Sequence, residues 1–190
     1  MADRISPLLG CEVRRPRCLS RPDPEGRSFQ MNDTLAGPGF VMRLERVFAA
    51  PRELVFDCMT KAEHLARWWG PRGFDVPVCE SDAVPGGRLV LHMRGPAPYG
   101  TNPVEGEFLE VSPIDRLSYV LRGFPGEDGS WGIEHVTTIN FSDAPGGGTL
   151  IRTATEVKQV SDALRPALGG MREGWSQSLD KMDELLAEIG

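Results

Sequence analysis

The sequence of 190 residues is acidic, with 21 Lys and Arg against 27 Asp and Glu and a net charge of −6. This length suits one domain with short extensions. Nucleic-acid-binding domains normally present a basic face, so we expect no nucleic-acid partner. No apolar run approaches the roughly 18 residues of a membrane-spanning helix, so we expect no membrane span. The 22 glycines and 16 prolines predict many turns, and therefore short strands rather than a helical bundle.

The N-terminal segment differs in composition from the rest of the chain. Residues 1–30 hold six arginines, four acidic residues and four prolines, but only one aromatic residue. Such a segment buries too little apolar surface to offset the entropy lost on ordering it. We therefore expect residues 1–35 to be a disordered arm, or an extension upstream of a true start at Met31, followed by a folded domain over residues 40–190. Residues 1–30 carry a net charge of +2, so the remainder, at −8, is more acidic than the whole.

The cysteines and histidines form no metal-binding pattern. None of the four cysteines belongs to a closely spaced pair of the kind that zinc sites use, and the three histidines share no local motif. We expect no metal and no cofactor, and reduced thiols in a cytoplasmic protein. The excess of 18 arginines over three lysines is typical of a GC-rich bacterial source.

The first patterned segments predict one strand and two short helices. Residues 40–48 alternate between polar and apolar side chains, as in a strand with one solvated face. Pro51 suits the first turn of a helix, where its missing N–H needs no partner. The residues that follow have the spacing of one buried helical face: Leu54, Val55, Cys58 and Met59. Thr60 is placed to cap a second short helix, which ends at Gly70-Pro71.

Six further strand patterns follow, separated by turns rich in Gly and Pro. They cover residues 74–82, 88–94, 104–111, 116–123, 134–142 and 149–157. Short connections of this kind join antiparallel strands. A long amphipathic helix closes the chain, and its apolar side consists of Met171, Trp175, Leu179, Met182, Leu185, Leu186 and Ile189.

This order of elements predicts an α+β fold in which a curved seven-stranded antiparallel sheet packs on the C-terminal helix. A helix is about 10–12 Å across, whereas seven strands at about 4.8 Å span roughly 30 Å. The sheet must therefore curve around the helix, and one helix need not fill the space inside the curve. The geometry predicts a cavity between the sheet and the helix.

Several short sequences, taken together and in order, resemble a known family. They include Trp68-Trp69-Gly70-Pro71, Pro85-Gly86-Gly87-Arg88, Met93-Arg94-Gly95, Gly174-Trp175 and the stretch APRELVFD at residues 50–57. Over residues 41–189 the chain is similar to the activator of heat shock protein 90 ATPase-like family of the START/Bet v 1 (SRPBCC) superfamily. The resemblance implies a helix-grip fold. Members of this superfamily mostly hold apolar or amphipathic small molecules, some catalyse reactions such as polyketide cyclisation, and others assist a chaperone.

Aromatic and sulfur-containing side chains near the expected cavity are candidates for ligand contact. Trp68 and Trp69 close a helix together, and either both are structural or one forms a wall of the pocket mouth. Trp175 lies on the buried side of the last helix, where a core role and a pocket role both fit. Methionine walls adapt to varied ligands. The predicted ligand-binding residues are Trp68, Trp69, Phe74, Leu91, Met93, Tyr119, Trp131, His135, Met171, Trp175 and Leu179.

His135 and Tyr119 are the weak candidates for a catalytic role. The alternation of strand 134–142 turns His135 toward the cavity beside Trp131, where an imidazole serves as a general base or as a hydrogen-bond partner. A Tyr119 hydroxyl inside the pocket would need a partner, which a ligand could supply.

Other polar and flexible features are less decisive. His92 is expected to face outward. An inward-pointing glutamate on strand 104–111 would have a raised pKa and be a site candidate, and the strand offers Glu105, Glu107 and Glu110. Residues 123–132 are long and rich in Gly for a hairpin turn, which leaves a flexible loop or a lid carrying Phe124 and Trp131.

These observations predict a domain that binds a small apolar or aromatic molecule in an internal cavity. One alternative is a cyclase- or hydrolase-type enzyme that uses the same cavity. Another is a cochaperone that activates a chaperone ATPase, although residues 1–30 are too short to be the additional N-terminal domain of the eukaryotic activators. A homodimer is also compatible with the sequence.

Overall fold

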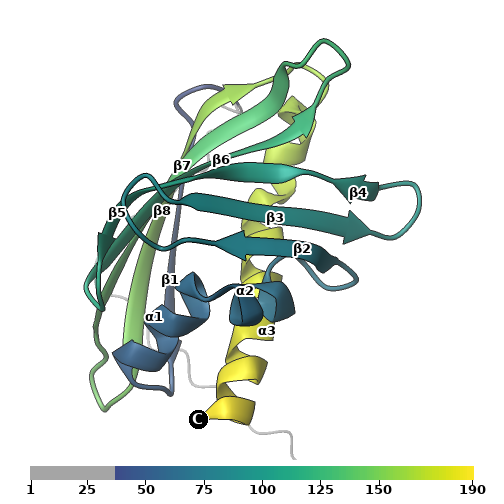
Figure 1. Cartoon of the computed structure of the whole chain (residues 1–190). Coiled ribbons are helices and arrows are strands. Elements are labelled where there is room, and N and C mark those ends of the chain that lie inside the picture. Colours follow the sequence, from purple (N-terminus) through teal and green to yellow (C-terminus); the bar gives the residue numbers. More distant parts are fainter. Residues whose placement is uncertain (1–36) are drawn as a thin grey trace, which may run out of the picture. The chain divides into compact units, whose positions relative to one another are not determined.

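A strongly curved antiparallel sheet wraps around the long C-terminal helix in the computed structural model, which describes residues 37–190 (Figure 1). The expected N-terminal arm lies outside the described residues. The helices are α1 Arg52–Thr60, α2 Ala62–Trp68, the 3-10 helix η2 Arg165–Gly170 and α3 Met171–Ile189. The strands are β1 Val41–Phe48, β2 Asp75–Ser81, β3 Arg88–Gly95, β4 Gly100–Asn102, β5 Val104–Ser112, β6 Arg116–Pro125, β7 Trp131–Asp143 and β8 Thr149–Val160.

The sheet follows the order β1-β8-β7-β6-β5-β3-β2, and each neighbouring pair is antiparallel. The predicted helix-grip fold with its seven strands is therefore confirmed. The three-residue strand β4 pairs with β3 outside this order. The sequence does not predict β4, because three residues are too few to show an alternation. The first and last strands lie side by side, which brings the chain back to the start of the domain before α3 begins.

Alternation along the strands decides which side chains face the helix. In β3, the side chains of Leu89, Leu91 and Met93 belong to the core, as the pattern predicts. His92 lies on the other face, where its Nε2 is 3.4 Å from Glu105 Oε1. The expectation that His92 faces outward is confirmed.

Two details of the short helices differ from the expectation. Pro51 is the N-cap of α1 with an extended backbone, one residue before the first helical turn. Thr60 does not cap α2, whose N-cap is Lys61. Instead, the Thr60 hydroxyl donates to the carbonyl of Phe56, 2.8 Å away within α1. A buried hydroxyl takes this bond because the carbonyl one turn back is the acceptor within its reach.

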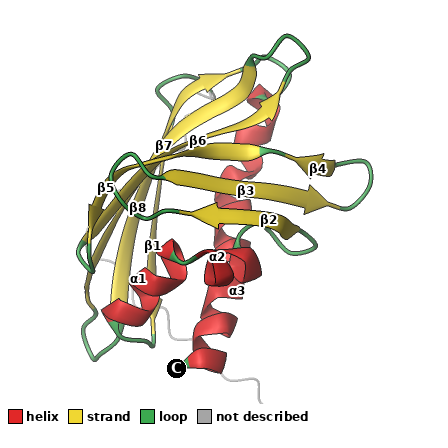
Figure 2. Ribbon diagram, in the orientation of Figure 1, coloured by secondary structure: helices red, strands yellow, loops and turns green. Residues whose placement is uncertain are grey.

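The main core lies where α1 and α2 join the C-terminal half of α3 against the sheet (Figure 2). Trp68 and Met182 are almost wholly buried there, and the indole N–H of Trp68 donates to the carbonyl of Cys58 at 2.8 Å. A second, smaller cluster forms around Val157, Val160 and Leu168, near the N-terminal end of α3. None of the helices in the described part of the chain has the length and apolar character needed to cross a bilayer.

Candidate functional site

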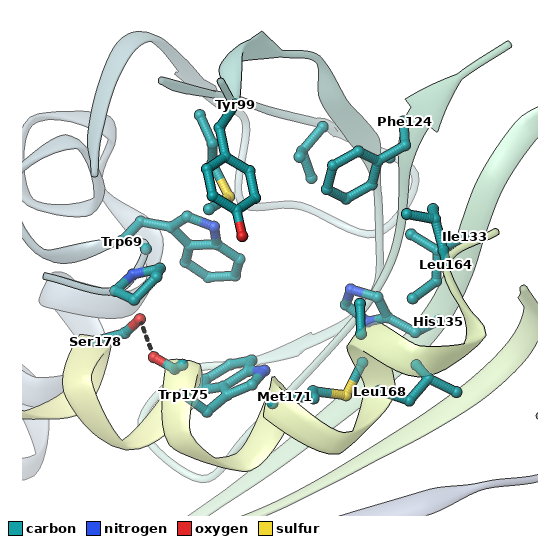
Figure 3. A pocket seen from close by; sticks show the side chains of 18 of the residues that line it. Trp69, Tyr99, Phe124, Ile133, His135, Leu164, Leu168, Met171, Trp175 and Ser178 are labelled. Atoms are coloured by element: carbon teal, nitrogen blue, oxygen red, sulfur yellow. Dashed lines mark hydrogen bonds between the residues drawn. The ribbon is translucent and has the colours of Figure 1, made fainter. Parts of the chain in front are cut away.

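A cavity of about 590 Å³ lies between the concave face of the sheet and the N-terminal half of α3 (Figure 3). Its walls come from the end of α2, from β3, β5, β6 and β7, and from η2 and the first turns of α3. It borders both the main core and the smaller cluster, because its lining includes residues of each. Ligand pockets typically measure about 300–1,000 Å³, so this cavity has the size of a small-molecule site.

Trp69 and Trp175 form an aromatic wall of the cavity. Their ring centroids are 5.6 Å apart in an edge-to-face arrangement. Trp69 also lies 5.3 Å from Trp68 and 6.1 Å from Tyr119, both of which are buried. Edge contacts of this kind add to the stabilisation from burial alone. The wall is therefore continuous with the packed core, which holds its rings in place.

The segment after α2 is held on α3 by hydrogen bonds. The ammonium group of Lys181 donates to three carbonyl oxygens, those of Trp69 (3.3 Å), Gly70 (3.0 Å) and Phe74 (3.3 Å). The backbone N–H of Arg72 donates to Gln177 Oε1 at 3.1 Å. Burial and the nearby charge of Arg72 lower the pKa of Lys181. These bonds fix the position of Trp69 relative to Trp175.

Two exposed aromatic residues, Tyr99 and Phe124, line the cavity from the sheet side. Tyr99 packs edge-on against Phe74, with ring centroids 5.5 Å apart. Phe124 has a φ of 57°, in the left-handed region that non-glycine residues rarely adopt. A Cβ on the facing Gly132 would lie 2.8 Å from the Phe124 carbonyl oxygen and 2.7 Å from Leu164 Cδ1. Glycine at residue 132 is therefore needed for this close approach.

The expectation of a long loop over residues 123–132 is wrong. Strand β6 continues to Pro125 and β7 starts at Trp131, which leaves a connection of residues 126–130. The strand pairing persists to Pro125 and Trp131, and Gly132 allows close approach to the backbone of Phe124 at this hairpin end. Of the two aromatic residues placed on the expected lid, Phe124 lines the cavity and Trp131 does not.

His135 lies in the middle of β7, and its ring extends into the cavity (Figure 3). Its Nδ1 is 3.3 Å from Thr137 Oγ1, which is 2.9 Å from Thr155 Oγ1. Burial lowers the pKa of His135 to about 4, although the neighbouring Glu134 carboxylate acts in the opposite direction. The imidazole is therefore neutral at pH 7.

Charged side chains are absent from the cavity wall within residues 37–190. None of Glu105, Glu107 and Glu110 lines it. Glu110, for example, pairs with Arg116 at 2.8 Å. The hydroxyl of Ser178 does line the cavity, but it donates to the carbonyl of Gly174 at 2.8 Å. The site therefore has a largely apolar, aromatic surface, and the imidazole of His135 and the hydroxyl of Tyr99 are polar groups that extend into it (Figure 3).

Tyr119 lies behind this wall rather than in it. Its ring packs between Trp69 and Phe108, and only 2% of the residue is exposed. The hydroxyl has no hydrogen bond of ordinary geometry within the described part of the chain, although the nearby Thr137 hydroxyl lowers its pKa. Burial has the larger effect and raises the pKa of Tyr119. Tyr119 is therefore a core residue and not part of the cavity lining.

Six of the predicted ligand-binding residues come together around the cavity: Trp68, Trp69, Met93, His135, Met171 and Trp175. The other five do not line it. Leu91, Tyr119 and Leu179 are buried in the main core, Phe74 packs on Tyr99, and the carbonyl of Trp131 accepts a hydrogen bond from Gln159 at the hairpin end.

Sequence reasoning misses the lining residues from the turn before β4, from η2 and from the segment before η2. Leu164 and Leu168 fall between the last predicted strand and the last predicted helix, where no period is visible. Tyr99 lies in a turn and gives no strand signal. One feature of the sequence does indicate the cavity. Gly174 lies on the apolar side of a long helix, and its lack of a side chain leaves space where another residue would pack.

Residues 37–190 contain neither a metal-binding cluster nor an activated cysteine. Within residues 37–190, no group of three or more His, Cys, Asp or Glu side chains could hold a metal ion. Cys58 and Cys79 are both free thiols there, and burial raises the pKa of each to about 11. Thiolates are the reactive form of cysteine, so neither residue is an activated nucleophile.

Comparison with known proteins agrees with the fold. The family model described as activator of Hsp90 ATPase homolog 1-like protein matches residues 49–187. The chain belongs to this family. The resemblance inferred from the sequence is therefore confirmed, and the domain is AHSA1-like, of the SRPBCC superfamily. A search of curated proteins finds no match to the sequence.

Solved structures share the fold of this AHSA1-like domain. A protein of Chromobacterium violaceum is 29% identical, with a TM-score of 0.66 over 78% of this chain and 98% of that one. The AHSA1 protein from Silicibacter pomeroyi is 24% identical, with a TM-score of 0.66 over 80% of this chain and all of that one. A protein of Rhizobium leguminosarum is 22% identical, with a TM-score of 0.68 over 80% and 97% of the two chains. The last two show similarity of fold alone.

Proposed function

We propose that this AHSA1-like domain binds a small apolar or aromatic molecule in the cavity between the sheet and α3. The observation that carries the proposal is the cavity of about 590 Å³ with its aromatic wall. None of the residues within 37–190 that line this cavity is charged. Apolar ligand surface gains about 25 cal/mol per Å² when it leaves water. Flat rings can pack against Trp69 and Trp175, whose positions are held by neighbouring contacts.

An enzymatic role is less well supported by the same geometry. Cyclase or hydrolase chemistry needs acid and base groups that converge on a substrate. In the described lining, His135 has no carboxylate or ammonium group beside it, and a pKa of about 4 makes it a weak base at pH 7. The family description names activation of the Hsp90 ATPase. The cavity supports ligand binding more directly, so ligand binding is the function that we propose.

The test uses Gly174, which lines the cavity in the middle of a helical turn. A Cβ at this residue would meet no atom within 4 Å. Gly174→Phe therefore projects a ring into the empty space, whereas Gly174→Ala leaves most of the space open. Both variants raise the helix propensity of residue 174, so Gly174→Ala is the matched control for an effect on the helix alone.

Binding is measured by titration with N-phenyl-1-naphthylamine, an uncharged probe that fluoresces in apolar surroundings. We expect saturable fluorescence with the natural protein and with Gly174→Ala, and a loss of at least tenfold in affinity with Gly174→Phe. Circular dichroism checks that all three proteins are folded. Absence of saturable binding by the natural protein, or equal binding by Gly174→Phe, would contradict a ligand site in this cavity.

A further inference from the structure

A short hydrogen-bonded row of polar side chains lies on the buried face of the sheet and ends in the cavity. It starts at Thr155 on β8, passes through Thr137 on β7 and reaches His135. Thr137 and Thr155 are fully buried, so protein atoms alone surround this row up to the imidazole. His135 Nδ1 faces Thr137, which leaves Nε2 as the second polar atom of the ring.

The surroundings of His135 do not suit a charged ligand group. The described lining has no Lys or Arg that could pair with a carboxylate. The nearest charged neighbour, Glu134, is an anion that is paired with Arg122. A carboxylate moved from water into such a site loses its hydration without gaining a partner of opposite charge. The lowered pKa of His135 agrees with this, since a neutral imidazole offers no ion pair.

The neutral imidazole can take either of two hydrogen-bonding forms. If Nδ1–H donates to Thr137 Oγ1, then Nε2 accepts a hydrogen bond, and if the Thr137 hydroxyl donates to Nδ1, then Nε2–H donates. A ligand hydroxyl is both a donor and an acceptor, so it matches both forms. A ligand without a polar group would leave Nε2 buried and unpaired, which costs free energy.

We propose that His135 selects aromatic ligands that carry an uncharged hydroxyl group, which hydrogen-bonds to Nε2, and that the cavity discriminates against the corresponding carboxylates. This inference rests on the proposed function and narrows it to a chemical class. His135 is the specificity-determining residue, and the Thr137–Thr155 pair orients its ring.

Three 2-substituted naphthalenes test the selectivity of the cavity: 2-naphthol, 2-methylnaphthalene and 2-naphthoate. They share the fused rings and differ in one substituent, which is a hydroxyl, an apolar group of similar size or an anion at pH 7. Equilibrium dialysis gives the affinity of each. With the natural protein we expect 2-naphthol to bind about 3–10-fold more tightly than 2-methylnaphthalene, as one net hydrogen bond provides. We expect 2-naphthoate to bind at least tenfold more weakly than 2-naphthol.

Two variants assign the selectivity to the imidazole. His135→Leu keeps a side chain of similar size without polar atoms, and it should reduce the preference for 2-naphthol over 2-methylnaphthalene to less than twofold. His135→Gln offers an amide donor and acceptor, and it should retain part of the preference. Circular dichroism and the affinity for 2-methylnaphthalene, which should change little, show that the cavity is intact.

The outcomes separate this inference from the proposed function. If the natural protein binds all three probes equally, or if 2-naphthoate binds most tightly, the cavity is a ligand site and the selectivity is wrong. If His135→Leu folds and keeps the full preference, His135 is not the selecting residue. If none of the probes binds, the proposed function and this inference fail together.

Discussion

The two halves of α3 face the same sheet but have different surroundings. In the C-terminal half, Leu179, Met182, Leu185 and Leu186 are each at most 4% exposed. In the N-terminal half, the apolar side continues through Met171, Gly174 and Trp175, and these residues line a cavity. One amphipathic helix therefore supplies both a packed core and a wall of the candidate site.

The difference arises from what else fills the curve of the sheet. Helices α1 and α2 contact the C-terminal half of α3 and occupy the remaining width there (Figure 1). Around the N-terminal half, α3 is joined by η2, the segment before it and residues 68–71 at the end of α2, and Gly174 contributes no side chain. The curved sheet is wider than one helix. The space inside its curve is therefore filled where three helices pack against the sheet, and a cavity remains where they do not.

Replacing one methionine by alanine in each half of α3 should give the largest difference in the free energy of unfolding. Met182→Ala should lower the free energy of unfolding by about 2–5 kcal/mol, because it leaves a hole in a close-packed core. Met171→Ala should cost less than about 1 kcal/mol, since this half-buried side chain already borders empty space. Urea unfolding measures both. Equal losses would show that the N-terminal half of α3 is packed as tightly as the C-terminal half.

The pH dependence of the free energy of unfolding tests whether His135, beside the cavity, is buried. The pKa of His135 is about 4 in the folded protein, against an ordinary value of 6.5. Between these two pH values the unfolded chain binds a proton that the folded protein does not, so stability is lost as the pH falls from 6.5 to 4. The loss approaches about 3–4 kcal/mol at most, since the pKa difference is about 2.5 units and one unit corresponds to about 1.4 kcal/mol.

His135→Gln isolates this contribution, because the other titrating groups remain in both proteins. The natural protein should lose more stability than the variant when urea unfolding is repeated at pH 7, 5.5 and 4.5. Parallel curves for the two proteins would mean that His135 is well solvated and that the cavity is open to water.

Lys181 joins the two halves, because it lies on α3 and holds the segment that carries Trp69. Lys181→Met keeps much of the side-chain length but removes the three hydrogen bonds to backbone carbonyls. We expect a loss of about 1–2 kcal/mol and faster hydrogen exchange of the amides of residues 69–74. Lys158→Met, which removes only a surface pair with Glu156, is the control. Unchanged exchange in Lys181→Met would show that the aromatic wall does not depend on this contact.

Gly174, which lines the cavity, gives the smallest expected effect, and Gly132 near it gives an effect of opposite sign. Gly174→Ala should raise the free energy of unfolding by about 0.5–1 kcal/mol, because alanine favours the helix and its Cβ meets open space. Gly132→Ala should destabilise the protein instead, since its Cβ would clash with Phe124 and Leu164. Thermal unfolding distinguishes the two signs. A destabilising Gly174→Ala would show that the space beside α3 is occupied.

Alternation and helical spacing are sufficient to predict most of the fold. They place Leu89, Leu91 and Met93 on the inner face of β3, and they place Met182 and Leu185 on the buried side of α3. Capping is less predictable, as Thr60 shows, because a hydroxyl can bond to its own helix instead of starting the next one. Strand β4 and helix η2 are not predicted, because their residues show no period over so short a length.

The candidate site is only partly visible in the sequence. Periodicity places Trp175 and Met171 on the side of α3 that faces the sheet, but it does not say whether a neighbour fills the space in front of them. That is decided by contacts between distant segments, such as the bonds from Lys181 to the segment after α2 and the approach of Leu164 to Gly132.

The sequence by itself determined the order of the elements, their buried sides and the family, because these follow from local spacing and short motifs. The alternation of β7 also indicated that His135 faces the cavity, whereas only the tertiary structure decided that Tyr119 lies in the core beside Trp69 and that Tyr99 and Phe124 line the cavity. The physical reason is that a cavity is the volume left over when all elements are packed. It depends on every neighbour at once and on no single stretch of the chain.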